Sequence, residues 1–327
     1  MNKKDVCRLV GGTVAGMSVA TAAAGGVIVK EKCFRVHPWQ PAPGHIPSKN
    51  EIYMDYLRRK GIERAKSQNM EHLEIISRDG LRLVGEYIHN TDVKRGKGEP
   101  VKVVILTHGY GGTGWNDLMI FADFYLKEGF DILAIEQRSH ARSEGTRITF
   151  GSRESDDMII WISRVIEIAG TDCKILLHGW SMGAATVYLT AAKGLPSQVK
   201  GVVFDCGYTA IEATMFQNAK DSTPIPPAYL WYLLQFMKPI ALIACRFRMK
   251  DAAPLFAAGR MHLPIFFVHG TADTTVPFWM GRKLYKASKA TPYRRMLVVR
   301  DAEHTHAYAG NKSGYEAGIR SLIDYCM

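Results

Sequence analysis

Short apolar segments alternate with amphipathic segments along most of the chain. Six segments rich in branched aliphatic residues are predicted strands, because unbroken apolar runs are typical of strands buried on both faces; they lie at 101–107, 130–135, 173–177, 199–204, 263–268 and 296–299. Between and after them, helical spacing of apolar residues predicts helices at 115–128, 158–166, 182–193, 278–288 and 313–325. This alternation predicts an α/β fold with a doubly wound, mostly parallel sheet.

The chain upstream of this alternation has a different pattern. Residues 34–47 hold four prolines and are typical of an extended linker. A capping box of Ser48 and Glu51 then predicts a helix that runs to about residue 68. Two strand-like segments follow at 71–77 and 81–89, and the Asp-Gly step between them indicates a hairpin.

A long insertion separates the predicted strands that end at residue 204 and begin at residue 263. It contains a proline cluster and an apolar, aromatic run at 229–243, with no strand pattern. Because structureless loops of this length are rare inside compact domains, we expect residues 208–260 to form a helical lid. Its aromatic residues fit an apolar acyl or aromatic substrate, or equally packing onto the core.

The first thirty residues form a separate segment. Residues 9–29 carry no charge and, at 1.5 Å per residue, span about 31 Å, close to the hydrocarbon thickness of a bilayer. Three basic residues precede this stretch and three follow it. A single-pass membrane anchor is the favoured interpretation; a cleaved signal peptide and a buried core helix are the alternatives. The basic N-terminus favours export of residues 34–327 to the outer face.

Composition excludes several classes of protein. Of 327 residues, 47% are hydrophobic and 22% charged, which argues against disorder. The net charge of +11 is accompanied by no nucleic-acid-binding motif, so a solvated basic surface is expected. Six cysteines lie far apart without a CxxC motif, which argues against a zinc ribbon, a redox motif or a disulfide scaffold.

The strongest chemical motif is Gly179-Trp180-Ser181-Met182-Gly183, which lies between a predicted strand and a predicted helix. A sharp strand–turn–helix junction needs small residues two before and two after the serine, and it exposes the serine oxygen at the helix N-terminus. The helix dipole and free amides there favour developing negative charge. This placement predicts that Ser181 is a nucleophile.

With this motif the chain resembles the α/β-hydrolase superfamily, and more closely its serine-aminopeptidase-like or esterase-like branch with an N-terminal membrane segment. The resemblance covers about residues 70–327 and also includes 107–112, Arg138 with 143–145, 269–273, 276–277 and 302–304. Near Arg138 the family usually has glycine where this chain has Ser139 and Ala141. The expected domains are an anchor or signal segment at 1–33, a linker and lead-in helix at 34–69, and the hydrolase domain with its lid at 70–327.

A serine hydroxyl needs a base, and the base needs an orienting acid. In this fold the chain order is serine, acid, histidine, which the resemblance assigns to Ser181, Asp273 and His304. Asp205, which ends an earlier predicted strand, is a competing acid, and His306 is a competing base.

The oxyanion hole is expected to use the backbone N–H groups of Tyr110 and Met182. No cofactor is implied, because the glycine-rich turn at 109–114 fits an oxyanion turn better than a nucleotide loop. No metal site is expected at His304 and His306, since the sequence supplies no supporting third ligand. Packing at the sheet edge is expected for His108, His178 and His269.

These expectations together indicate a serine hydrolase that forms an acyl-enzyme on Ser181. Its substrate is expected to be a small acyl ester or, next, an amide or short peptide. The alternatives are a serine aminopeptidase-like peptidase and a non-catalytic, membrane-tethered binding protein on the same fold. Nucleic acid is not an expected partner, and the expected location is the membrane, with one span and an extracytoplasmic catalytic domain.

Overall fold

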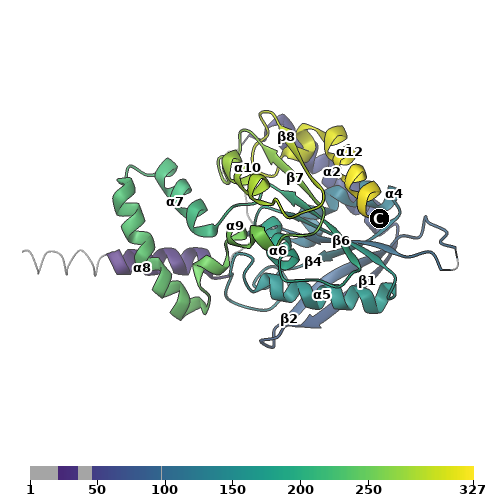
Figure 1. The fold of residues 1–327 in the computed structure, drawn as a ribbon, viewed down its shortest axis with the longest axis horizontal. Helices are drawn as coiled ribbons and strands as arrows, with labels where there is room; N and C mark the ends of the chain where they lie inside the picture. Colours follow the sequence, from purple (N-terminus) through teal and green to yellow (C-terminus); the bar gives the residue numbers. More distant parts are fainter. Residues whose placement is uncertain (1–20, 36–45, 97) are drawn as a thin grey trace, which may run out of the picture.

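One mixed sheet forms the centre of the molecule (Figure 1). The computed structural model describes residues 21–35, 46–96 and 98–327. Within them, eight strands pair in the order β1-β2-β4-β3-β5-β6-β7-β8. Their bounds are β1 Asn69–Ile76, β2 Arg82–His89, β3 Lys102–Thr107, β4 Phe130–Ile135, β5 Lys174–Trp180, β6 Val199–Asp205, β7 Ile265–Gly270 and β8 Arg294–Val299.

The sheet confirms the expected α/β architecture. β3 to β8 are parallel to one another, and β2 runs antiparallel to both β1 and β4. β1 and β2 form the predicted hairpin, in which Ile76 pairs with Arg82. The carboxyl ends of β3, β5, β6, β7 and β8 therefore meet at one edge, where ligands bind in open parallel sheets.

Helices cover both faces of the sheet. Alternate side chains of β3 separate the two layers, with Val104 and Leu106 in one hydrophobic cluster and Val103 and Ile105 in the other. The first cluster includes residues of α2 (Lys49–Lys66), α4 (Ala122–Lys127), α11 (Ala307–Gly310) and α12 (Lys312–Cys326). The second includes residues of α5 (Glu154–Ala169), α6 (Met182–Ala191) and α10 (Phe278–Ala287).

The helix predicted at 115–128 is divided into three pieces. The structure has α3 (Gly114–Leu118), a 3-10 turn η1 (Met119–Phe121) and α4. α2 packs closely here, because a Cβ added to Gly61 would lie 1.8 Å from the Met119 carbonyl oxygen. The prediction of one continuous helix was wrong because this close helix contact is invisible in the local sequence.

The insertion between β6 and β7 is helical. It contains α7 (Ile211–Ser222), α8 (Pro227–Cys245), α9 (Pro254–Ala257), and the 3-10 turns η2 (Met249–Asp251) and η3 (Ala258–Arg260). Among the described residues, α8 is the one helix long and apolar enough to cross a membrane, and 33% of its apolar window is buried. α7 and α8 project away from the sheet (Figure 1).

Residues 21–33 are also helical and lie beside α8 (Figure 1). One face of this helix is covered. Residues spaced four apart lie on the same face of a helix, and the buried positions are Thr21, Gly25, Val29 and Cys33. The Thr21 and Tyr229 hydroxyls are 3.0 Å apart, and a Cβ on Gly25 would lie 3.5 Å from Met237 Cγ. The expected apolar segment at 9–29 begins outside the described residues, and its described end packs on α8.

Candidate active site

Ser181 occupies a strained turn between β5 and α6. Its backbone has φ 54° and ψ −120°, an unusual conformation for a residue with a side chain. A Cβ on Gly179 would lie 2.2 Å from the Gly183 oxygen, and a Cβ on Gly183 would lie 2.0 Å from the Thr107 oxygen. Both glycines are therefore required by close backbone approach, as the sequence motif predicts.

His304 and Asp273 lie next to Ser181 and are hydrogen-bonded in a row. The Ser181 Oγ atom is 2.8 Å from His304 Nε2, and His304 Nδ1 is 2.7 Å from Asp273 Oδ2. Asp273 follows β7 and His304 follows β8, so neighbouring strand ends bring the three side chains together. This geometry allows the imidazole to accept the serine proton while the carboxylate stabilises the imidazolium.

The Asp273 side chain is suited to remain ionised. Burial alone would raise its pKa, but the contacts with His269 and His304 outweigh burial and lower the pKa to about 2. Its Oδ1 atom accepts a hydrogen bond from the Val276 N–H at 2.7 Å. Both oxygens are thereby oriented, one by the loop backbone and one by His304.

The competing acid, Asp205, has different partners. Its Oδ2 atom accepts a hydrogen bond from the Tyr315 hydroxyl at 2.9 Å, and its Oδ1 atom is buried with no hydrogen-bond partner among the described residues. Burial raises the pKa of Asp205 to about 6. His304 Nδ1 is hydrogen-bonded to Asp273 and not to Asp205, which favours Asp273 as the orienting acid.

His306, the competing base, lies at the start of α11. Its Nδ1 atom is 3.5 Å from the Glu303 carboxylate, and the contacts of Ser181 Oγ go to His304 instead. Burial lowers the pKa of His306.

The turn that follows β3 lies against the nucleophile. A Cβ on Gly109 would lie 3.2 Å from Ser181 Cβ and 3.6 Å from Ser181 Oγ. Tyr110 is the next residue in this turn, and Met182 is the first residue of α6, where an amide has no partner within the helix. The two residues whose amides are expected to form an oxyanion hole are thus neighbours along the chain of Gly109, which approaches Ser181, and of Ser181 itself.

The three histidines expected to pack at the sheet edge are buried. His108 Nε2 accepts from the Gln137 N–H at 2.9 Å, and His178 lies between the Tyr125 and Tyr315 hydroxyls, at 3.0 Å from each. Burial lowers the pKa of each of these two histidines to about 3, so both are neutral.

His269 differs from the other two histidines, because its Nε2 atom lies 3.4 Å from Asp273 Oδ2 and contacts the Val276 carbonyl oxygen at 2.8 Å. Sequence analysis missed this contact, which only the fold creates.

The loop around Arg138 contains two residues with positive φ that are not glycine. Ser139 has φ 64° and Ala141 has φ 40°, so the backbone of both residues lies in the left-handed region that favours glycine. The guanidinium of Arg138 anchors this loop through bonds of 2.6 and 2.7 Å to Asp157 and of 3.0 Å to Asp79.

An apolar cluster adjoins the site. Tyr110 stacks on Phe150 with ring centroids 5.7 Å apart, and Met182 is 1% exposed within the same cluster. The cluster continues into α8 and the helix at 21–33 through Leu234, Met237 and Val29. Side chains beside the nucleophile are therefore continuous with the helical insertion.

Cys206 was not singled out by the sequence, yet it adjoins the same row. Potential ligand atoms of Cys206, Asp273 and His304 lie within 4.8 Å of one another. Burial raises the pKa of the Cys206 thiol well above its usual range, which disfavours the thiolate that metals bind. The hydrogen bonds of His304 to Asp273 and Ser181 account for the arrangement of the other two side chains.

Comparisons with known proteins agree with this architecture. Residues 102–241 match the family model of the alpha/beta hydrolase fold. The uncharacterized protein YqkD of Bacillus subtilis is 22% identical over 221 residues, which are 68% of this chain and 70% of that protein. The uncharacterized protein YfhR of Escherichia coli K12 is 20% identical over 239 residues, which are 73% and 75% of the two chains.

Solved structures show the same fold. An esterase from Pyrococcus furiosus superposes with a TM-score of 0.64 at 20% identity, covering 90% of this chain and 98% of that chain. An acylaminoacyl peptidase from Pyrococcus horikoshii superposes with a TM-score of 0.56 at 16% identity, covering 79% and 41%. The chain therefore has the α/β-hydrolase fold.

Proposed function

We propose that the protein is a serine hydrolase that cleaves carboxylic esters through an acyl-enzyme on Ser181. The observation that carries this proposal is the row of two short hydrogen bonds from Ser181 through His304 to Asp273. An isolated serine hydroxyl is a weak nucleophile, and this row supplies the base and its orienting acid.

The proposed reaction has two halves. Ser181 Oγ attacks the ester carbonyl carbon while its proton passes to His304 Nε2, and Asp273 stabilises the imidazolium through Nδ1–H. The tetrahedral oxyanion accepts hydrogen bonds from the amides of Tyr110 and Met182. The carbon–oxygen bond to the leaving alcohol then breaks, and the alcohol oxygen takes the proton from His304.

Water completes the cycle. His304 removes a proton from the water molecule as its oxygen attacks the acyl carbon, and the same oxyanion donors act again. The bond between the acyl carbon and Ser181 Oγ breaks, and Oγ regains its proton from His304. The products are a carboxylic acid and the free enzyme.

An ester with an apolar acyl group is the substrate class that we propose. The apolar cluster around Met182, Tyr110 and Phe150 adjoins the nucleophile and favours aliphatic or aromatic acyl groups. The esterase among the structural neighbours is consistent with this choice. We also propose that α7 and α8 act as a lid, since Leu234 and Met237 of α8 share this cluster with Met182.

A peptidase is the second candidate function. The structural similarity to an acylaminoacyl peptidase favours it, although this chain spans 41% of that protein. An amide substrate would use the same three side chains, with His304 protonating the leaving amine. A non-catalytic binding protein is the remaining alternative, and it requires a Ser181 that does not react.

We further propose a single-span membrane protein with its catalytic domain on the outer face. The uncharged segment at 9–29, with basic residues on both sides, supports this location. Protease added to intact cells is expected to degrade the catalytic domain. Full-length protein with an intact N-terminus in the soluble fraction would overturn the anchor.

A substrate panel tests the function. Wild-type protein and Ser181→Ala are assayed with p-nitrophenyl esters of increasing acyl length and with aminoacyl and acylaminoacyl p-nitroanilides. The proposal expects turnover of esters that Ser181→Ala abolishes. Turnover of anilides alone would establish the peptidase, and turnover of neither class by folded wild-type protein would favour the binding protein.

A further inference from the structure

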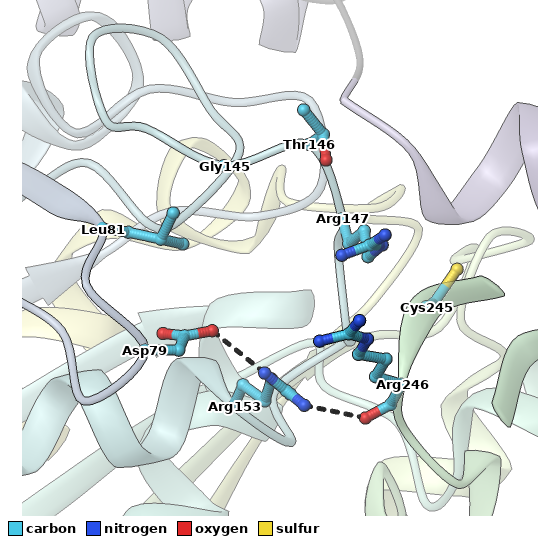
Figure 2. Close-up of a pocket in the computed structure, with 8 residues that line it drawn as sticks. All are labelled: Asp79, Leu81, Gly145, Thr146, Arg147, Arg153, Cys245 and Arg246. Atoms are coloured by element: carbon cyan, nitrogen blue, oxygen red, sulfur yellow. Dashed lines mark hydrogen bonds and ion pairs between the residues drawn. The ribbon is translucent and has the colours of Figure 1, made fainter. Parts of the chain in front are cut away.

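A pocket separate from the Ser181 site lies where three segments meet. Its volume is about 350 Å³, and its lining includes loop residues 145–147, Arg153 just before α5, and Arg246 at the end of α8. The guanidinium groups of Arg147, Arg153 and Arg246 gather on one side, and Asp79 and Leu81 lie on the other (Figure 2). None of these residues belongs to the row of Ser181, His304 and Asp273.

Positive charge in this pocket exceeds negative charge. Arg153 Nη1 is 2.9 Å from Asp79 Oδ2, and the same carboxylate also holds Arg138 at 3.0 Å. In the described part of the chain, no carboxylate lies within 4.0 Å of the guanidinium of Arg147 or Arg246. Of the three pocket arginines, Arg153 is the one with an ion pair among the described residues, and it shares the Asp79 carboxylate with Arg138.

The neighbouring charged groups do not restore the balance. The Arg35 guanidinium donates to the carbonyls of Ser143 and Gly145, at 3.0 and 3.3 Å, and adds another positive charge. The nearby Glu154 carboxylate accepts hydrogen bonds from the N–H groups of Thr149 and Gly151, and it forms no ion pair within the described residues. The junction thus keeps a net positive charge.

The backbone holds these arginines in place. Arg246 has φ 54° and ψ 38°, a left-handed conformation that is unfavourable for arginine, and its carbonyl accepts from Arg153 Nη2 at 2.9 Å. Arg147 forms an antiparallel bridge with Phe34, which follows the helix at 21–33. Like charges are therefore held together by main-chain contacts, an arrangement that a bound anion would stabilise.

We propose that this pocket binds the phosphate group of a phosphorylated ligand. Guanidinium forks match the oxygens of phosphate with paired, charge-assisted hydrogen bonds, and Arg147 and Arg246 are exposed and free to form them. The volume leaves room for an organic substituent beyond the phosphate. Such a ligand would contact both loop 145–147 and the end of α8 and hold them together. It would thereby stabilise the packing of the helix at 21–33 on α8.

Calorimetric titration tests the site on the full chain in neutral detergent micelles. The probes are inorganic phosphate and glycerol 3-phosphate, at an ionic strength held constant with chloride. We expect saturable binding that Arg147→Gln/Arg246→Gln weakens at least about tenfold. Arg282→Gln is the matched control, because Arg282 is exposed on α10 and forms no ion pair within the described residues. Each single variant is also measured, and circular dichroism with thermal melting verifies that every variant is folded.

A third probe separates the two sources of phosphate. Dihexanoyl phosphatidic acid carries the same headgroup as glycerol 3-phosphate with two short acyl chains. Binding at least tenfold tighter than glycerol 3-phosphate would identify a lipid headgroup, and equal binding would identify a free phosphate compound. The proposal is overturned if folded wild-type protein shows no saturable binding of any probe, or if the arginine variants bind as tightly as wild type.

Discussion

His304 Nδ1 lies 2.7 Å from Asp273 Oδ2, whereas Asp205, the carboxylate at the end of β6, receives its hydrogen bond from Tyr315. Asp273→Asn keeps the size of the side chain but can no longer fix the imidazole tautomer that accepts the serine proton. We expect kcat to fall about 10⁴-fold for this variant. Asp205→Asn, the matched control, should retain kcat within about tenfold of wild type. Steady-state kinetics on one ester check both values, and the reverse ranking would assign the acid to Asp205.

The raised pKa of Asp205 predicts how stability depends on pH. Burial raises this pKa to about 6 in the folded protein, against about 4 in an unfolded chain. The folded protein therefore resists ionisation, and the stability that the protonated carboxyl contributes is present below about pH 4 and is lost as the pH rises through 6. Asp205→Asn cannot ionise and should not lose stability in this way.

Urea unfolding of both proteins between pH 4 and pH 8 measures this difference. The free energy of unfolding of wild type should fall, relative to that of Asp205→Asn, by about 3 kcal/mol across the window. Parallel curves for the two proteins would contradict the buried, unpaired state of Asp205 Oδ1.

The turn at Ser181 predicts a strong effect of one methyl group. A Cβ at position 183 would lie 2.0 Å from the Thr107 carbonyl oxygen and 2.6 Å from the His108 carbonyl oxygen. Both are backbone atoms that cannot move independently. Gly183→Ala should lower the free energy of unfolding by about 3 kcal/mol and remove activity. Gly259→Ala, where nothing lies within 4 Å of the new Cβ, is the control and should change stability by less than about 1 kcal/mol. Equal melting temperatures for the two variants would be inconsistent with the observed turn.

The packing of residues 21–33 on α8 can be tested with two adjacent glycines. A side chain at Gly25 would meet Met237 and Ile240 at 3.5 Å, whereas nothing lies within 4 Å of a Cβ at Gly26. The Cys33 and Cys245 thiols are both buried and lie near each other where the two helices end, and the interaction with Cys245 and burial raise the pKa of Cys33. Copper phenanthroline and oxygen should therefore oxidise these two thiols to one disulfide.

Gly25→Leu should slow formation of this disulfide at least about fivefold, because overpacking separates the helices. Gly26→Leu should leave the rate unchanged. Peptide mapping by mass spectrometry, with the other thiols alkylated, follows the Cys33–Cys245 pair. Slowing by both variants, or by neither, would mean that the helices do not pack through Gly25.

Local patterns were sufficient to predict most of the fold. The strand at 130–135 and the turn around Ser181 depend on neighbouring residues, so the sequence predicted them closely. The choice between Asp205 and Asp273 depends on which strand end His304 faces, and the sequence favoured Asp273 without excluding Asp205. In the structure, the His304 side chain lies beside Asp273.

Contacts between distant segments could not be predicted. Arg147 and Arg246 are almost one hundred residues apart, and their pocket exists because α8 returns to the loop after β4. The packing of residues 21–33 on α8 and the contact of His269 with Asp273 have the same origin. Each of these contacts depends on the tertiary fold, because the sequence around one partner contains no pattern that indicates the other.

The most direct test of the central claim is the site at which a fluorophosphonate reacts. Its phosphorus should bond to Ser181 Oγ, with fluoride as the leaving group and the serine proton taken up by His304. We predict one adduct per folded chain, located on the peptide that contains Ser181, and no adduct on folded Ser181→Ala. Labelling of folded Ser181→Ala at the wild-type rate, or an adduct at another residue, would contradict the account.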